Sequence, residues 1–382
     1  MIIQAVRKIS RDNVPRFCWR QLAQFQNIGQ TAEAIIKLHG LKPDQFDNAR
    51  NQAREIKSCL AQAREYYDAA ASVSLATQPV LLYYAVMSMA LAEILFKQSG
   101  DSRLAMLRAE HNCHGLDFRV TGKVTPKQTL TQVARLLVAK AQVMADGPRG
   151  TFEVWRRSHR EFPVSGVMMT IFPNMTTSET FQILLGAADE PPKRLPPRGV
   201  SLLDCVAPLP YLSDSLSHRG AGIDTVRAII VARKEPNAEN PTTSIIIQPT
   251  PEDVLDRLNE RVICAPASVN GVEFREVTQG YAIDLLPVRF KESMYFPQAI
   301  CMSDRHIHFN CGDLDYGEFG LLYLALHICG NFSRYYPDLW LRQIEENSPL
   351  ALTIEELCSH AFERLPLLVL SELSRTYHVL ES

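Results

Sequence analysis

The chain has 382 residues, which is long enough for two or three domains, and its 46% hydrophobic and 21% charged residues are ordinary for a globular protein. Its 40 Lys and Arg nearly balance its 42 Asp and Glu, giving a formal net charge of -2. The chain therefore has no overall positive field that would draw it to nucleic acid or to an acidic membrane. Any such binding must use a local patch.

The cysteines and the N-terminal segment favour a cytoplasmic protein. The nine cysteines are odd in number and have no CxxC spacing, so we expect mostly buried, reduced thiols. The first residues meet a charge at Arg7 and lack the apolar core of roughly 7 to 15 residues that a signal peptide requires. Val80 to Phe96 is barely long enough to span a membrane and contains Glu93, so we interpret it as a buried core helix and expect no membrane partner.

The N-terminal third has the spacing of three helices. Apolar residues recur at helical spacing from Trp19 to Leu38, and Gly40 follows where a C-cap is expected. A second amphipathic helix is predicted from about Asp44 to Ala71. Pro79 sits at the first turn of a third helix, which is apolar nearly all round and must therefore be covered on every side.

The middle of the chain mixes helix and strand signals. Thr125-Pro126 predicts a helix that runs to about Ala145. Four closely spaced prolines predict a loop over residues 187–199. Apolar runs predict strands at residues 167–172, 228–232, 244–248, 281–286 and 307–309, with a helix at residues 250–262.

Helical spacing returns after Tyr316 and ends at Tyr336-Pro337. The sequence from Thr353 to Glu356 is a capping box and predicts another helix start, and a last helix is predicted after Pro366.

These elements predict an α+β fold that is predominantly α. We expect the N-terminal helical region (residues 1–146) and the C-terminal helices (residues 313–382) to pack together as one bundle. Residues 147–312 are then a mixed α/β insert that contains strands and the proline-rich loop near residues 187–199.

Separated segments at both helical ends carry a family resemblance: Ala63–Ala70, Pro79–Tyr84, Leu91-Ala92, His114–Leu116, Arg149–Phe152, Ser333–Trp340 and Leu365–Val369. Together they resemble the YaaC-like family of bacterial proteins, although the resemblance is thin between about residues 160 and 310. It implies a bacterial cytosolic protein and supplies no reaction. The helical part is also similar to HEPN-type bundles, which occur in ribonucleases and in nucleic-acid-linked defence systems.

Arg108 and His114 are a candidate catalytic pair. HEPN ribonucleases carry an arginine followed a few residues later by a histidine, and these two residues have that spacing. A histidine can abstract a proton at neutral pH, and an arginine can stabilise transition-state charge. The alternative is structural, with His114 capping a helix end and Gly115 supplying a turn.

The densest basic cluster surrounds one tryptophan and comprises Arg149, Trp155, Arg156, Arg157 and Arg160. Cations beside an aromatic ring can hold a phosphate backbone and stack a base, so the cluster is a candidate nucleic-acid site. The alternative is a solvated helix face whose charge is partly balanced by Glu153 and Glu161.

A candidate zinc site combines two histidines of a predicted strand with a cysteine on either side: Cys301, His306, His308 and Cys311. These are ligand types that zinc prefers. Their spacing matches no common finger or ribbon, and the alternative is a strand with one solvent-facing side.

No phosphate-binding P-loop, dinucleotide glycine fingerprint, nucleophile elbow or HExxH pair occurs in the sequence, and we expect no cofactor. The leading hypothesis is a binding or scaffold component of a defence or nucleic-acid-linked complex, without visible catalysis. Its partner would be a protein or a second copy of the chain, with RNA or DNA as a further candidate. One alternative is a metal-independent endoribonuclease that uses Arg108 and His114, and another is a zinc-bearing binding module.

Overall fold

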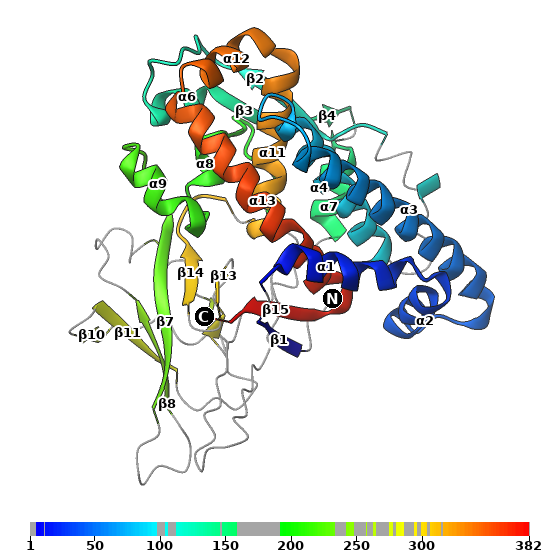
Figure 1. The fold of residues 1–382 in the computed structure, drawn as a ribbon. Helices are drawn as coiled ribbons and strands as arrows, with labels where there is room; N and C mark the ends of the chain where they lie inside the picture. Colours follow the sequence, from blue (N-terminus) through cyan, green and yellow to red (C-terminus); the bar gives the residue numbers. More distant parts are fainter. Residues whose placement is uncertain are drawn as a thin grey trace.

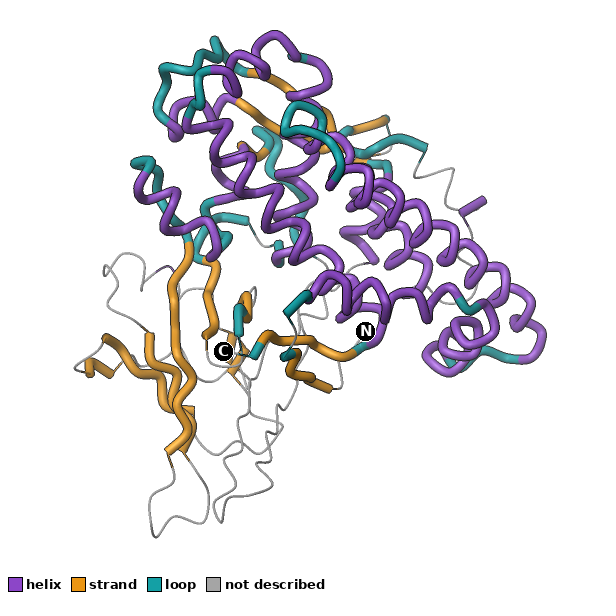
Figure 2. The backbone as a smooth tube through the Cα atoms, in the orientation of Figure 1, coloured by secondary structure: helices purple, strands orange, loops and turns teal. Residues whose placement is uncertain are grey.

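The structure, a computed structural model, places a helical bundle above a six-stranded sheet (Figure 1). Figure 2 shows the helices gathered in one part of the molecule and most strands in the other. The predicted α+β fold, predominantly α, is confirmed. The residues that the structure describes are 5–10, 12–97, 104–105, 112–145, 147–158, 192–233, 242–247, 257, 263–264, 275–277, 280–285, 294–295, 299–303, 306–314 and 316–381.

Helix α4 (Gln78–Lys97) lies in the middle of the bundle. It packs against α3 (Phe46–Ala71), α7 (Thr151–Ser158), α11 (Glu318–Tyr335) and α13 (Pro349–Ser374). The helix is long and apolar enough to cross a membrane, but 72% of its apolar 18-residue window is buried within the protein. N-terminal and C-terminal helices thus share one bundle, as predicted, because an all-round apolar helix needs neighbours on each side.

The first predicted helix is divided into three pieces: α1 (Val14–Leu22), the 3-10 turn η1 (Ala23–Gln26) and α2 (Ile28–His39). The break occurs at Asn27, which is extended and whose side chain accepts a hydrogen bond from the amide three residues on, so a new helix starts there. The predicted C-cap is confirmed, because Gly40 has a φ of 59° in the left-handed region.

The prediction of one helix over residues 125–145 is wrong. Helix α6 (Leu130–Leu136) is short, and strand β3 (Leu137–Ala141) follows it directly. Strand β3 pairs antiparallel with both β2 (Leu116–Val120) and β6 (Val200–Ser201). The long-range pairing on both edges overrides the local helical pattern.

Helix α13 is continuous, so the predicted starts at Thr353 and after Pro366 are wrong. The N-cap is Ser348, whose hydroxyl accepts a hydrogen bond from the amide of Ala351 at 3.1 Å. The Thr353 hydroxyl donates instead to the Pro349 carbonyl at 2.8 Å, one turn back within the helix.

The sheet is antiparallel, in the order β10-β11-β8-β7-β14-β13. Its strands are β7 (Thr225–Arg233), β8 (Thr242–Ile247), β10 (Arg275–Val277), β11 (Gly280–Leu285), β13 (Ala299–Cys301) and β14 (His306–Asn310). Strands β7, β8, β11 and β14 fall on predicted strands. The strand predicted at 167–172 and nearly all of the helix predicted at 250–262 lie outside the described residues.

The two ends of the described chain lie side by side in Figure 1, because β1 (Ala5–Ile9) and β15 (Thr376–Leu380) pair in parallel. The other described elements are short: η2 (Pro43–Gln45), β4 (Val143–Met144), β5 (Gly147–Pro148), α8 (Leu202–Val206), η3 (Pro210–Leu212), α9 (Ser213–His218), β9 (Ile263–Cys264), β12 (Met294–Tyr295) and α12 (Pro337–Glu345). Helices α7 and α8 of the predicted insert pack on α4 and α11, so the insert contributes to the bundle.

Candidate functional site

A pocket of about 330 Å³ opens between the C-terminal half of α11 and the turn that leads into β2. It is lined by Cys113, His114, Leu116, Asp117, Phe118, Gln142, His327, Asn331, Tyr335 and Tyr336. We call this cavity the His114 pocket. Its size is at the lower end of the range of about 300 to 1,000 Å³ that is usual for ligand sites.

Two glycines packed against each other fix the turn that carries His114. Gly115 has a φ of 80° and Gly150 a φ of 97°, and a Cβ on Gly150 would lie 2.3 Å from the Cα of Gly115. The start of α7 then donates to this turn, from the Thr151 amide to the Cys113 carbonyl at 3.0 Å and from the Phe152 amide to the His114 carbonyl at 3.2 Å. His114 is therefore held by backbone contacts between segments that are separated in sequence.

The His114 ring is half-buried among tyrosines of α4. Its centroid lies 5.6 Å from that of Tyr83 and 6.4 Å from that of Tyr84. Burial and the positive charge of Arg334 both lower the pKa of His114 below its ordinary value. The imidazole is thus neutral at pH 7 and able to accept a proton.

Arg334 connects α11 to α4 beside this pocket. Its Nη1 donates to the Tyr84 hydroxyl at 2.9 Å, and its guanidinium lies 5.0 Å from the ring centre of Tyr335. Tyr335 is 60% exposed. An exposed cation and an exposed ring thus stand next to a neutral histidine.

On the inner wall of the pocket, His327 Nε2 has no hydrogen-bond partner within the described part of the chain. The buried hydroxyls of Tyr83 and Tyr323, which do not line the pocket, have none there either. Burial, then the charge of His114, lowers the pKa of His327 to about 3, so its ring is neutral. Asn331 Nδ2 donates to His327 Nδ1 at 3.1 Å, which leaves the hydrogen on Nε2. A buried donor without an acceptor is costly in free energy.

Close approach of α4 and α11 brings these side chains together. A Cβ on Gly330 would lie 3.1 Å from the Cβ of Tyr83 and 3.2 Å from the Pro79 carbonyl oxygen. The small residue lets the helices cross closely enough for Tyr83 and His327 to meet edge to face, with ring centroids 5.1 Å apart.

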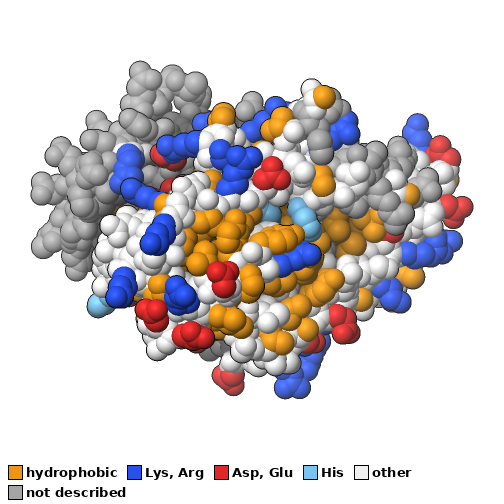
Figure 3. Space-filling model, turned by 90° about the horizontal axis from the view of Figure 1, so that it is seen from above, with side chains coloured by type: hydrophobic (Ala, Val, Ile, Leu, Met, Phe, Trp, Pro, Cys, Tyr) orange, Lys and Arg blue, Asp and Glu red, His pale blue; other side chains and the backbone are white. Residues whose placement is uncertain are grey.

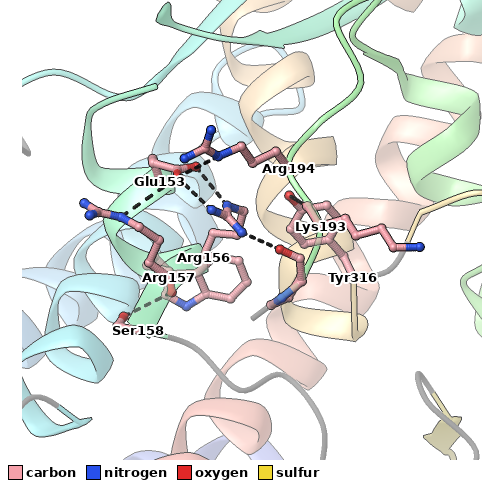
Figure 4. A network of polar contacts seen from close by, with 9 residues as sticks. Glu153, Arg156, Arg157, Ser158, Lys193, Arg194 and Tyr316 are labelled. Atoms are coloured by element: carbon pink, nitrogen blue, oxygen red, sulfur yellow. Dashed lines mark hydrogen bonds and ion pairs between the residues drawn. The ribbon is translucent and has the colours of Figure 1, made fainter. Parts of the chain in front are cut away.

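The structure corrects the predicted nucleic-acid cluster at two of its residues. Trp155 is fully buried, and its Nε1 donates to Glu93 Oε2 at 2.9 Å, so its ring does not face solvent. Arg156 is 6% exposed and binds the Glu153 carboxylate with two donors, at 2.7 and 2.8 Å (Figure 4). The tryptophan packs in the core because it lies on the face of α7 that meets α4.

The two other described arginines of the cluster, Arg149 and Arg157, do not form one surface with Trp155. Arg157 is exposed and lies 3.9 Å from Glu153, whereas Arg149 is half-buried beside the His114 turn and its amide donates to the Gln142 carbonyl. Arg160 lies outside the described residues.

Two of the candidate zinc ligands, His306 and His308, lie on one face of β14 as predicted, opposite the buried Ile307 and Phe309. Cys311 is buried, and its thiol contacts the Phe309 carbonyl at 3.7 Å. Nothing is described of the Cys301 side chain. Across the described residues, no group of three or more His, Cys, Asp or Glu side chains is placed to hold a metal ion.

Of the predicted catalytic pair, Arg108 lies outside the described residues. The structure places Arg334, from the far end of the sequence, near His114. Sequence reasoning also missed Tyr335, His327 and Asn331 as site residues. Their position in or shortly before the Ser333–Trp340 segment, which carries part of the family resemblance, is the signal that could have identified them.

The face in Figure 3 is the end of the molecule at which α12 and β2 lie. Hydrophobic side chains fill its middle, histidine shows among them, and most Lys and Arg side chains lie around its edge. Chemically, the His114 pocket offers rings for stacking, amides and a carboxylate for hydrogen bonding, a neutral imidazole and a nearby guanidinium.

Residues 30–129 match a family model described as YaaC-like Protein. This range contains Tyr83, Tyr84 and His114, and it confirms the family resemblance there. The likeness to HEPN-type bundles has no such support and stays a prediction. No curated protein and no solved structure matches the chain.

Proposed function

We propose that this chain, whose residues 30–129 are YaaC-like, is an RNA-binding component of a nucleic-acid-linked complex, and that the His114 pocket receives one unpaired base. The observation that carries the proposal is the combination of aromatic rings and hydrogen-bonding side chains around one cavity, with Arg334 beside it. A protein or a second copy of the chain is the other proposed member of the complex, which light scattering and pull-down would test.

The chemistry of the pocket suits a nucleobase. A base has two flat apolar faces, which stack on rings such as Tyr335 and Phe118, and a polar edge, which amides such as Asn331 and Gln142 can bind. The guanidinium of Arg334 is placed to meet a neighbouring phosphate. A cavity of about 330 Å³ accommodates a single nucleotide and not a duplex.

The balanced charge of the chain favours recognition of a few nucleotides over tight coating of a long strand. The formal net charge is -2, so attraction to phosphate is local. We therefore expect a shallow dependence of affinity on salt, because only one or two phosphates meet cations.

Fluorescence anisotropy with a labelled single-stranded RNA and its duplex tests this proposal. Because stacking contributes about 1–3 kcal/mol per base, Tyr335→Ala should weaken binding of the single strand by roughly 5- to 150-fold. Phe46→Ala is the matched control, since Phe46 is also an exposed ring but lies on α3. Equal affinity of both variants, or no binding by the wild type, would refute the proposal.

A second candidate function, metal-independent RNA cleavage, is favoured by the neutral imidazole of His114 beside Arg334. In that reaction His114 would take the proton of a 2'-hydroxyl, whose oxygen attacks the adjacent phosphorus. The 5'-oxygen would leave with a proton from solvent, giving a 2',3'-cyclic phosphate and a 5'-hydroxyl.

Incubating RNA with the protein in EDTA separates the two candidates. Cleavage by the wild type that His114→Ala abolishes and Arg334→Ala reduces would support catalysis. Binding without cleavage leaves the binding role alone, and equal cleavage by wild type and His114→Ala would identify a contaminating nuclease.

A further inference from the structure

A second cavity, of about 350 Å³, lies where the segment from Lys193 to Val200 passes α8 and the turn between β14 and α11. Four cations line it: Lys193, Arg194, Arg198 and Arg257. Three carboxylates line it as well: Asp204, Asp224 and Asp313. So dense a set of charges of both signs suits a ligand that has an anionic group and several hydroxyls.

The wall that carries most of these cations is fixed in place. The Tyr316 hydroxyl donates to the Lys193 carbonyl at 2.8 Å, and the buried Arg156 donates to the Pro192 carbonyl (Figure 4). At the other end Gly199 has a φ of 83°, and a Cβ there would lie 2.5 Å from the Ala139 carbonyl oxygen. The cavity therefore has a wall that is anchored at both ends.

Among the described residues that line the cavity, four cations face three carboxylates. Glu153 already accepts two close hydrogen bonds from Arg156, while Arg194 reaches the same carboxylate only at 3.7 Å and is 64% exposed. In Figure 4 Arg194 extends towards Glu153, and Lys193 extends to the opposite side of the segment. An anion entering the cavity would meet Arg194 and Arg198, whose distances to the carboxylates of Glu153 and Asp313 are 3.7 and 3.5 Å.

The ion pair between Arg198 and Asp313 at the edge of the cavity can be broken at little cost in free energy. Arg198 Nη2 and Asp313 Oδ2 are 3.5 Å apart, and their side chains are 75% and 88% exposed. Such an exposed pair contributes little to stability, so Arg198 can turn to a better-matched anion. A phosphate is that anion, because its oxygens fit the two parallel donors of a guanidinium.

We infer that this cavity binds a phosphate ester of a sugar, with Arg198 and Arg257 on the phosphate and the aspartates accepting hydrogen bonds from sugar hydroxyls. Arg257 already donates to Asp224 Oδ1 at 3.3 Å, which holds its guanidinium at the cavity. The Asp204 carboxylate also accepts the Ser201 amide at 2.8 Å and is thereby oriented. The inference does not depend on RNA binding at the His114 pocket.

Isothermal titration calorimetry of the full chain with ribose 5-phosphate, ribose and inorganic phosphate tests the inference. Ribose 5-phosphate should bind more tightly than either of the other two. Arg198→Gln should weaken its binding by about tenfold or more, because a charge-assisted pair of hydrogen bonds is lost. Arg157 is an exposed arginine outside the lining, so the affinity of Arg157→Gln for ribose 5-phosphate should stay within about twofold of the wild-type affinity.

The Tyr335→Ala variant should bind ribose 5-phosphate like the wild type, which separates this site from the His114 pocket. Three outcomes would overturn the inference: no binding of ribose 5-phosphate, equal binding by Arg198→Gln and Arg157→Gln, or inorganic phosphate binding as tightly as the ester. Because Arg198 is largely exposed, its variant is expected to fold, and an unchanged Tm checks this.

Discussion

At the scale of single residues, the contact between Gly115 and Gly150 determines where His114 lies. Gly150→Ala should lower the free energy of unfolding by more than about 2 kcal/mol, because the backbone is left-handed and the new Cβ would meet backbone atoms at 2.3 Å. Gly40→Ala is the control, since Gly40 also has a positive φ, of 59°, but nothing within 4 Å of a Cβ. Urea unfolding followed by circular dichroism measures both, and equal losses would show that the contact is unimportant.

Residue identity alone revealed only part of this site. The sequence pointed to His114 and to a turn at Gly115, and the structure has both. It also paired His114 with Arg108, which lies outside the described residues, and it did not point to Arg334, whose charge lowers the His114 pKa. A motif with short spacing cannot show which distant residue the fold brings near.

At the scale of elements, one buried ion pair joins α11 to α13. Arg364 Nε and Nη2 lie 2.5 and 2.7 Å from the two oxygens of Glu318, and both side chains are 4% exposed. Glu318→Ala should cost about 3–5 kcal/mol, because it leaves a buried guanidinium without its carboxylate. In thermal unfolding, the stability of the double variant Glu318→Leu with Arg364→Met should be closer to that of wild type. A double variant that is less stable than Glu318→Ala would contradict this account.

The long helices could be predicted from the sequence, whereas the prediction failed where pairing with distant strands determines the conformation. The spacing of apolar residues correctly predicted α3, α4 and α11, since each buries a long stripe or nearly its whole surface. It failed at β3, where pairing with β2 and β6 sets the conformation. Long-range hydrogen bonds of this kind leave no local signature.

At the scale of the whole molecule, segments that are far apart in sequence meet around α4. Tyr83 and Tyr84 lie in the first half of the all-round apolar helix, His114 follows that helix in sequence, and Arg334 lies near the end of α11. The sequence predicted that the C-terminal helices cover α4, but not that this packing also forms the His114 pocket. Core packing and the candidate site thus share the same helix crossing, at Gly330.

Buried histidines should make the stability of the whole fold sensitive to mild acid. Burial is the main cause that lowers the pKa of His327 to about 3 and those of His308 and His378 to about 4. In the unfolded chain a histidine titrates near 6.5. Above that pH both states are neutral and the full stability is present, whereas below it protons bind only to the unfolded chain, so stability falls until the folded pKa is reached.

For His327 this linkage amounts to about 2 kcal/mol between pH 7 and pH 5. Urea unfolding measures the free energy of unfolding at both pH values. Between pH 7 and pH 5 this free energy should fall by about 2 kcal/mol less in His327→Gln than in wild type, although the variant is less stable at pH 7. His218→Gln, at an exposed histidine of α9, is the control and should keep the wild-type loss. If His327→Gln lost as much stability as the wild type, the ring would be protonated in the folded protein, and the neutral inner wall of the His114 pocket would have to be abandoned.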